Sequence, residues 1–411
     1  MLLNKNIRTS PWLTLISSFG AVLLVFCIVL YPDQAFQASL QGLSIWWKLI
    51  FPALLPFLVL SEMMIAFGFV HGLGILLDPV MKRLFGIPGV GGWALALGWT
   101  AGYPAGAEAT AKLRNQQALE RHEAHRLLAL SHVSNPVFIV VVVGVGFLHQ
   151  PQTGILLGIF HWGSALLTGI ILHIISPRPP RTFLTDDTTV QTLSSPNSHA
   201  PKRRWQQIIG AIEEAHRSDG RTFGKLLGDA VTSAVQRLMM IGGYMMIFSI
   251  IAKIFHFLLP FTIESYWVQG FFEIHLGSYA FSHIQTLSTL VQMALLSGVL
   301  AWSGICAHLQ VRSMTQSTDM SHIFFIATRF LHAILAMIIT FACWNPLQSL
   351  MGRVMPTLLP AWTSAEEPTS HWLTQFQGWF SWYVLPIWFI GILALLMLGS
   401  GMFSLFRRRH S

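Results

Sequence analysis

Between Leu127 and Pro177 the chain has no Asp, Glu, Lys or Arg. A soluble domain cannot cover so long a segment without charges, whereas a membrane helix needs about 20 predominantly apolar residues. The polar turn from His149 to Gly154 divides the segment. The sequence therefore predicts two membrane helices joined at this turn.

Further apolar segments of similar length recur along the chain. The whole sequence is 53% hydrophobic and 10% charged, against about 25% charged residues in soluble domains. We therefore predict an all-α polytopic membrane protein, in contact with the lipid bilayer. Its basic residues lie mostly in loops and tails, without a basic-aromatic module, so we expect no nucleic-acid partner. The predicted apolar segments are 12–31, 47–70, 89–111, 128–148, 153–175, 230–258, 287–311, 322–346 and 379–405.

Composition divides the chain into three parts. Residues 1–176 form an N-terminal span and a first membrane half, 177–228 a hydrophilic loop, and 229–411 a second membrane half. The run 12–32 exceeds a normal signal-peptide core, which favours a retained span. Because Lys and Arg mark cytoplasmic segments, we predict that the N-terminus, the 177–228 loop and the C-terminus are cytoplasmic. Segment 259–286 has no Lys or Arg and is predicted to be an outside loop.

The segment 89–111 has a different character, because helix-breaking residues interrupt it. Gly98, Gly102, Pro104 and Gly106 would free backbone groups that lipid cannot satisfy. Both flanks of the segment are basic, so both are predicted on the cytoplasmic side. A re-entrant hairpin satisfies both conditions.

A weak internal similarity relates the two halves at a separation of 200 residues. It aligns 89–111 with the Gly-containing segment 287–311. Paired interrupted segments indicate a transporter binding site. Symmetry favours a second hairpin at 287–311, while the basic C-terminus favours a full span, and both alternatives stay open.

Two groups of polar residues lie in apolar context and are candidates for substrate binding. Pro136 disturbs the helix ladder beside Ser134 and Asn135, which suits a polar substrate or a cation. The alternative is a kinked helix whose side chains satisfy the local backbone. Arg329 is the candidate for an anion contact, since its planar fork fits a carboxylate. The alternative is that Arg329 lies one turn inside its helix and snorkels to the interface, or forms a structural pair with Glu62 or Glu108.

Glu62, Glu108 and His132 are candidates for ion or proton coupling. Glu108 could equally pair with Lys112 four residues on. Other histidines, such as His149, His161 and His173, are placed near the membrane interfaces without a special role. We expect no catalytic residue, metal or cofactor, because no HExxH or Walker A pattern is present.

The stretch Gly-Tyr-Pro-Ala-Gly-Ala at 102–107, followed by Ser-Asn-Pro-Val-Phe at 134–138, resembles the Gate, or nucleoside-recognition, membrane domain. The layout of the whole chain resembles a family of sporulation integral membrane proteins. The binding residues that this resemblance implies are Gly102, Pro104, Gly106, Ser134, Asn135 and Pro136. Tyr103, as a ring contact, and Arg329, as an anion contact, are further candidates that rest on the chemistry of their side chains.

The resemblance implies a fold distantly like the concentrative nucleoside transporters, with two pseudo-repeated helix bundles and interrupted or re-entrant segments. It also implies transport of dipicolinic acid out of the mother cell across the outer forespore membrane. The alternatives are a transporter of a nucleoside or related polar solute, and a non-transporting scaffold of a sporulation complex that uses the 177–228 loop. Homo-oligomers and sporulation membrane partners also stay open.

Overall fold

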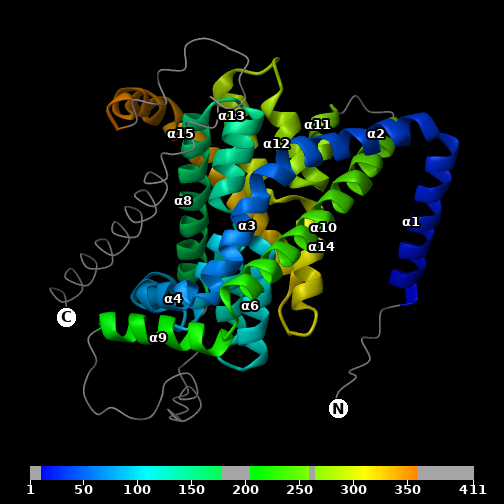
Figure 1. Cartoon of the computed structure of the whole chain (residues 1–411). Coiled ribbons are helices and arrows are strands. Elements are labelled where there is room, and N and C mark those ends of the chain that lie inside the picture. Colours follow the sequence, from blue (N-terminus) through cyan, green and yellow to red (C-terminus); the bar gives the residue numbers. More distant parts are fainter. Residues whose placement is uncertain (1–10, 177–203, 259–263, 359–411) are drawn as a thin grey trace.

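The computed structural model describes residues 11–176, 204–258 and 264–358, and all regular elements in these ranges are helices (Figure 1). The predicted span 379–405, the basic termini and residues 177–203 of the predicted loop lie outside the described residues. The all-α prediction is confirmed. Five helical segments are long and apolar enough to cross a membrane: Pro32–Ala66, Pro151–Ile175, Phe223–Phe255, Thr289–Thr315 and His322–Met351.

The first part of the chain, up to the predicted loop, folds into eight α-helices and three π-helical segments, η1 to η3. Their bounds are α1 Pro11–Leu30, α2 Pro32–Ile45, η1 Trp46–Ile50, α3 Phe51–Ala66, α4 Phe69–Val80, η2 Met81–Phe85, α5 Gly91–Ala101, α6 Tyr103–Asn115, α7 Arg121–Ser131, η3 Phe138–Phe147 and α8 Pro151–Ile175.

The later part follows with seven α-helices in the described residues. Their bounds are α9 Arg204–Asp219, α10 Phe223–Leu258, α11 Ser265–Phe272, α12 Ile274–Ser282, α13 Thr289–Trp302, α14 Gly304–Thr315 and α15 His322–Leu358.

Two peripheral helices frame the bundle in Figure 1. α1 stands apart from the other helices and exposes large apolar side chains such as Trp12 and Phe19, as a lipid-facing helix does. α9 lies crosswise to α8 and packs on α4, where Ile212 contacts Gly68 and Gly72. The segment predicted as a hydrophilic loop, 177–228, thus contains the whole of α9 and the start of α10 at Phe223.

The predicted division of the uncharged segment is confirmed. η3 ends at Phe147 and α8 begins at Pro151, so the polar turn joins two helices. Pro136 is preceded by a non-helical stretch, 132–135, between α7 and η3. The disturbance expected near Pro136 thus becomes a complete break in the helix.

The internal repeat has an offset of 171 residues, not 200. His132 contacts Ser303 and His161 contacts His332, each across 171 positions. The same offset relates the ends of α5 and α11, the ends of α7 and α13, and the starts of α8 and α15. The repeat therefore pairs α5–α8 with α11–α15.

The directions of the paired helices follow from their contacts with α15. Along α7, His125 lies near Ser321 and Ala129 near Arg329, so the residue numbers rise together. α7 and α15 therefore run in the same direction.

Along α13 the residue numbers rise while those of the contacting residues on α15 fall. Ser297 bonds to Thr340, while Ala301 packs in one apolar cluster with Ala333. α13 therefore runs against α15 and also against α7, its counterpart in the repeat. Equivalent helices run in opposite directions, which is the arrangement of an inverted repeat.

This register decides between the two alternatives for 287–311 and excludes the hairpin. α13 packs along α15 and α14 packs against α6, so the two arms diverge instead of folding back on one another. The second hairpin is α11–α12, where Gly277 would place a Cβ only 2.4 Å from Gly270 Cα. It lies in 259–286, the segment interpreted as a loop. Its two short helices carry too few apolar residues to be recognised as a membrane segment.

Candidate functional site

The first hairpin consists of α5 and α6, which meet at Gly102. Gly102 has φ 93°, a backbone conformation that favours glycine. A Cβ on Gly106 would lie 2.9 Å from Gly98 Cα and 2.5 Å from Ser131 O. Gly98 and Gly106 thus allow the two helices to approach each other and the end of α7. For Gly106, close packing is a structural role beside the predicted binding role.

The second break, at 132–135, lies against the tip of this hairpin. A Cβ on Gly102 would lie 3.5 Å from Asn135 Nδ2. Asn135 Oδ1 accepts the Phe138 N–H at 2.8 Å and so caps the start of the next helix. Pro136, which has no N–H to donate, directly follows Asn135. The two motifs singled out in the sequence are therefore adjacent in space.

The second half supplies two more breaks. Glu273 separates α11 from α12, and its carboxylate accepts the Leu276 N–H at 2.7 Å and faces His275 Nδ1 at 2.6 Å. Ser303 separates α13 from α14, and both Ser303 and Gly304, the first residue of α14, have positive φ. A Cβ on Gly304 would lie 2.9 Å from Glu273 Cα, so these two breaks also touch.

The four breaks converge. His132 Nε2 lies 3.2 Å from Ser303 Oγ, which joins the break in α7–η3 to the break in α13–α14. The rings of Tyr103 and His132 are 4.9 Å apart, and Tyr103 lies within electrostatic range of Glu273. Broken backbone at membrane depth occurs only where protein or a water-filled cavity surrounds it. The convergence of four breaks is therefore the candidate binding site.

Arg329 is fully buried at this site, on α15. Its Nη1 donates to His132 O and its Nη2 donates to Ala129 O at 3.0 Å, so it caps the broken end of α7. Neither Glu62 nor Glu108 pairs with it, and the described residues supply no other acidic partner within ion-pair distance. The ion pair considered as an alternative role for Arg329 is therefore not formed, and within the described residues this buried cation has no carboxylate counter-charge.

Two further histidines are buried at the site, and one of them, His161, was placed near a membrane interface by the sequence. His161 and His332 are both fully buried, and their ring centroids are 5.0 Å apart. The Ser134 N–H donates to His161 Nε2 at 3.1 Å, whereas Ser134 Oγ has no hydrogen-bond partner in the part of the chain that the structure describes. The 171-residue repeat places these two histidines at equivalent positions, whereas the alignment at a separation of 200 residues does not pair them.

The candidate coupling carboxylates lie away from the breaks. Glu62 forms a 3.1 Å ion pair with Arg237 of α10, and Glu108 is exposed on α6. Lys112 lies over the Trp93 ring at 5.8 Å, which is not the pairing with Glu108 that its spacing favoured. Of the three predicted coupling candidates, only His132 lies at the convergence of breaks.

The breaks also present helix N-termini to the site. Glu273 caps α12 and Asn135 caps η3, but α6 and α14 start without a side-chain cap. Free N–H groups and the positive end of the helix dipole favour an anion. Together with Arg329, this arrangement can bind a small anion and orient it.

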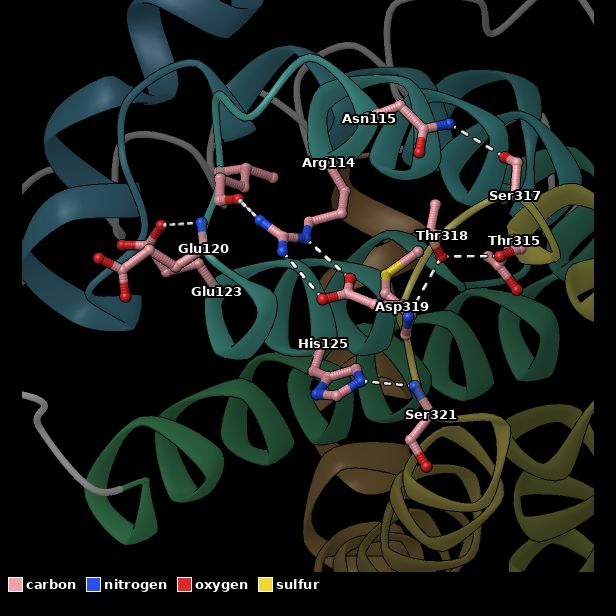
Figure 2. A network of polar contacts seen from close by, with 12 residues as sticks. Arg114, Asn115, Glu120, Glu123, His125, Thr315, Ser317, Thr318, Asp319 and Ser321 are labelled. Atoms are coloured by element: carbon pink, nitrogen blue, oxygen red, sulfur yellow. Dashed lines mark hydrogen bonds and ion pairs between the residues drawn. The ribbon is translucent and has the colours of Figure 1, made fainter. Parts of the chain in front are cut away.

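A polar network ties the two halves together at one end of the bundle (Figure 2). Arg114, at the end of α6, donates to both carboxylate oxygens of Asp319 at 2.9 Å, and Asn115 donates to Ser317. This hydrogen bonding raises the pKa of Arg114 and lowers the pKa of the Asp319 carboxyl. The network joins the first hairpin to the α14–α15 loop.

Sequence comparisons relate the chain to known membrane proteins. Residues 47–150 match the Gate family, described as nucleoside recognition, and this range contains the first hairpin, with its break at Gly102, and the break at 132–135. The sporulation integral membrane protein YlbJ of Bacillus subtilis (strain 168) is 35% identical over 351 residues, which cover 81% of this chain and 83% of that protein. No solved structure matches the chain.

Proposed function

Since the chain belongs to the YlbJ-like sporulation integral membrane proteins with a Gate nucleoside-recognition domain, we propose that it transports a small anionic aromatic solute. Dipicolinate is the substrate that we propose, moved from the mother cell across the outer forespore membrane. The site would be the convergence of breaks formed by Gly102, residues 132–135, Glu273 and Ser303–Gly304.

The observation that carries the proposal is the buried charge of Arg329. A buried ion without a counter-ion is unfavourable by several kcal/mol. The two carbonyl acceptors of Arg329 offset part of that cost, and an anion would offset more. The uncapped starts of α6 and α14 add partial positive charge near the same breaks.

Aromatic rings near the breaks suit a planar substrate. Tyr103 and Phe325 both contact the His132 ring, with centroids 4.9 Å away in each pair. Ring faces and edges of this kind stack on or against an aromatic solute. A pyridine dicarboxylate combines the ring with the charge that Arg329 requires.

A nucleoside is the second candidate, favoured by the match of residues 47–150 to a nucleoside-recognition family. Within the described ranges Ser134 Oγ has no hydrogen-bond partner, so it could bind a base or ribose hydroxyl. In that case Arg329 has a structural role only and does not contact the substrate.

The test is uptake of labelled dipicolinate by proteoliposomes that contain the full chain. We expect saturable uptake that Arg329→Gln lowers by about 10- to 100-fold, the loss of one or two charge-assisted hydrogen bonds. Arg329→Lys keeps the charge but not the planar fork, so its uptake should lie between that of the wild type and that of Arg329→Gln. Arg312→Gln on the exposed side of α14 is the matched control and should retain uptake.

The competing functions give different results in the same assay. Uptake of uridine or adenosine, with no uptake of dipicolinate, would replace the proposed substrate by a nucleoside. Absence of uptake of either, with a folded protein, would favour a scaffold. The thermal midpoint of each variant separates loss of binding from loss of fold.

A further inference from the structure

His161 and His332 occupy the same position in the two halves and face each other across the repeat. Both side chains are fully buried, with their ring centroids 5.0 Å apart. Each ring makes hydrogen-bond contacts through Nε2, while Nδ1 is buried and has no hydrogen-bond partner among the described residues. A buried polar atom without a partner is unfavourable and points to a proton, a water or a ligand that it receives.

The partners of the two Nε2 atoms differ, and this fixes the two tautomers. His161 Nε2 accepts the Ser134 N–H at 3.1 Å, so a neutral His161 carries its proton on Nδ1. His332 Nε2 lies 3.0 Å from the His161 carbonyl oxygen, to which it can only donate. A neutral His332 therefore has a bare lone pair on Nδ1.

The two histidines consequently respond to a proton in different ways. Protonation of His161 at Nε2 would break its bond from Ser134, whereas protonation of His332 at Nδ1 breaks none of its hydrogen bonds. His332 also lies three residues after Arg329 on α15, on the same face of the helix. An anion held by Arg329 is thus within reach of His332.

The charged and titratable groups around the pair contain no carboxylate. In the described residues, the groups that act on His132, His161 and His332 are these three rings, His308 and Arg329. With the site empty, the positive charge of Arg329 opposes a second cation nearby. A bound dianion instead favours a second positive charge nearby, because Arg329 alone neutralises only one of the two negative charges of the dianion.

We propose that His332 takes up one proton at Nδ1 when the anion binds, so that the solute and a proton move together. This rests on the proposed function. The proton comes from the water on the side from which the dianion enters, and it leaves with the dianion on the other side. Two positive charges, on Arg329 and on His332, then match the two carboxylates.

The experiment is calorimetric titration of the purified full chain with dipicolinate at pH 7.5, in two buffers with different ionisation enthalpies. The difference in binding heat gives the number of protons taken up. We expect about one proton for each bound dianion, and an affinity that falls about tenfold for each pH unit above neutrality. His332→Gln, which keeps a donor for the His161 carbonyl oxygen, should bind more weakly and take up no proton.

His308→Gln is the matched variant, because His308 Nε2 also faces a carbonyl oxygen, that of Trp302, and its Nδ1 is also without a partner. It should still take up one proton. Dipicolinate binding without proton uptake, or a proton lost in His308→Gln but kept in His332→Gln, overturns this inference and leaves the proposed function standing. Absence of any binding overturns both. If His332→Gln does not fold, the pH dependence of the wild-type affinity decides.

Discussion

Arg114 and Asp319 are 205 positions apart in the chain, yet their side chains meet in two parallel contacts of 2.9 Å. Arg114 also donates to Leu119 O at 2.7 Å, which ties the pair to the α6–α7 loop. The pair thus links the first hairpin to the loop that precedes α15. Any motion of one half against the other has to stretch or break this contact.

The pair should contribute a measurable but small coupling energy. Arg114 and Asp319 are 25% and 48% exposed, so solvent screens much of their attraction. In a double-mutant cycle with Arg114→Gln and Asp319→Asn, we expect a coupling of about 0.5–1 kcal/mol in thermal unfolding. The control is the same cycle with Lys82→Gln and Asp78→Asn, an ion pair between residues four positions apart in the chain. A coupling no larger than that of the control would contradict a special role for the inter-half pair.

His125 should make stability depend on pH. Its Nε2 accepts the Ser321 N–H at 2.8 Å, and burial, together with the charge of Arg121, lowers its pKa from 6.5 to about 4. Because the unfolded chain binds this proton more readily, stability is complete above pH 6.5 and is lost as the pH falls towards 4. The loss should be on the order of 1–3 kcal/mol.

Comparison of variants isolates this contribution from other groups that titrate in the same range. His125→Gln can still accept the Ser321 N–H but does not titrate, so its stability should fall less between pH 6.5 and 4. His122→Gln, whose ring pairs with exposed Glu120, should follow the wild type. Identical pH profiles for all three proteins would argue against the assignment.

Gly106→Ala should destabilise the first hairpin. The new methyl group would lie 2.5 Å from Ser131 O and 2.9 Å from Gly98 Cα, both backbone atoms. We expect a loss of about 1–3 kcal/mol, seen as a lower thermal midpoint. Gly163→Ala on α8 meets no described atom within 4 Å and should not lower stability, since alanine favours a helix over glycine.

Gly277→Ala tests the second hairpin in the same way. Its Cβ would lie 2.4 Å from Gly270 Cα, so α11 and α12 would have to separate. We expect a loss of stability similar to that of Gly106→Ala and a lower transport rate, because the tip at Glu273 would shift. Gly243→Ala on α10 meets nothing within 4 Å and serves as control. Wild-type behaviour of Gly277→Ala would refute the packing of α11 on α12.

The sequence predicted the elements that are long or chemically distinctive. The polar turn in the uncharged segment was predicted correctly, and α8 after it is long enough to span a membrane, whereas the helix predicted before it is interrupted at 132–135. Pro136 and Gly102 marked real breaks, because a missing N–H and a positive φ are local properties. These signals need no knowledge of the neighbouring segments.

What the sequence did not predict depends on contacts between distant segments. Apolar identities at a separation of 200 residues arise by chance, and they concealed the repeat that His161 and His332 reveal. The α11–α12 hairpin has only 8- and 9-residue helices, below the length that hydropathy detects. The partners of Arg329 are backbone carbonyl groups, which leave no pattern in side-chain sequence.

The inverted repeat has a consequence for sidedness. Because equivalent helices run in opposite directions, the backbone offers a solute similar surroundings from either face of the membrane. Any preference for one direction must then come from positions where the halves carry unlike residues. Gly158 lies three residues before His161, as Arg329 lies three before His332, so the cation of the site has only a hydrogen atom as its counterpart. A preference for one direction of transport would therefore depend on the few positions at which equivalent residues of the two halves differ, and Arg329 is the largest of these residues.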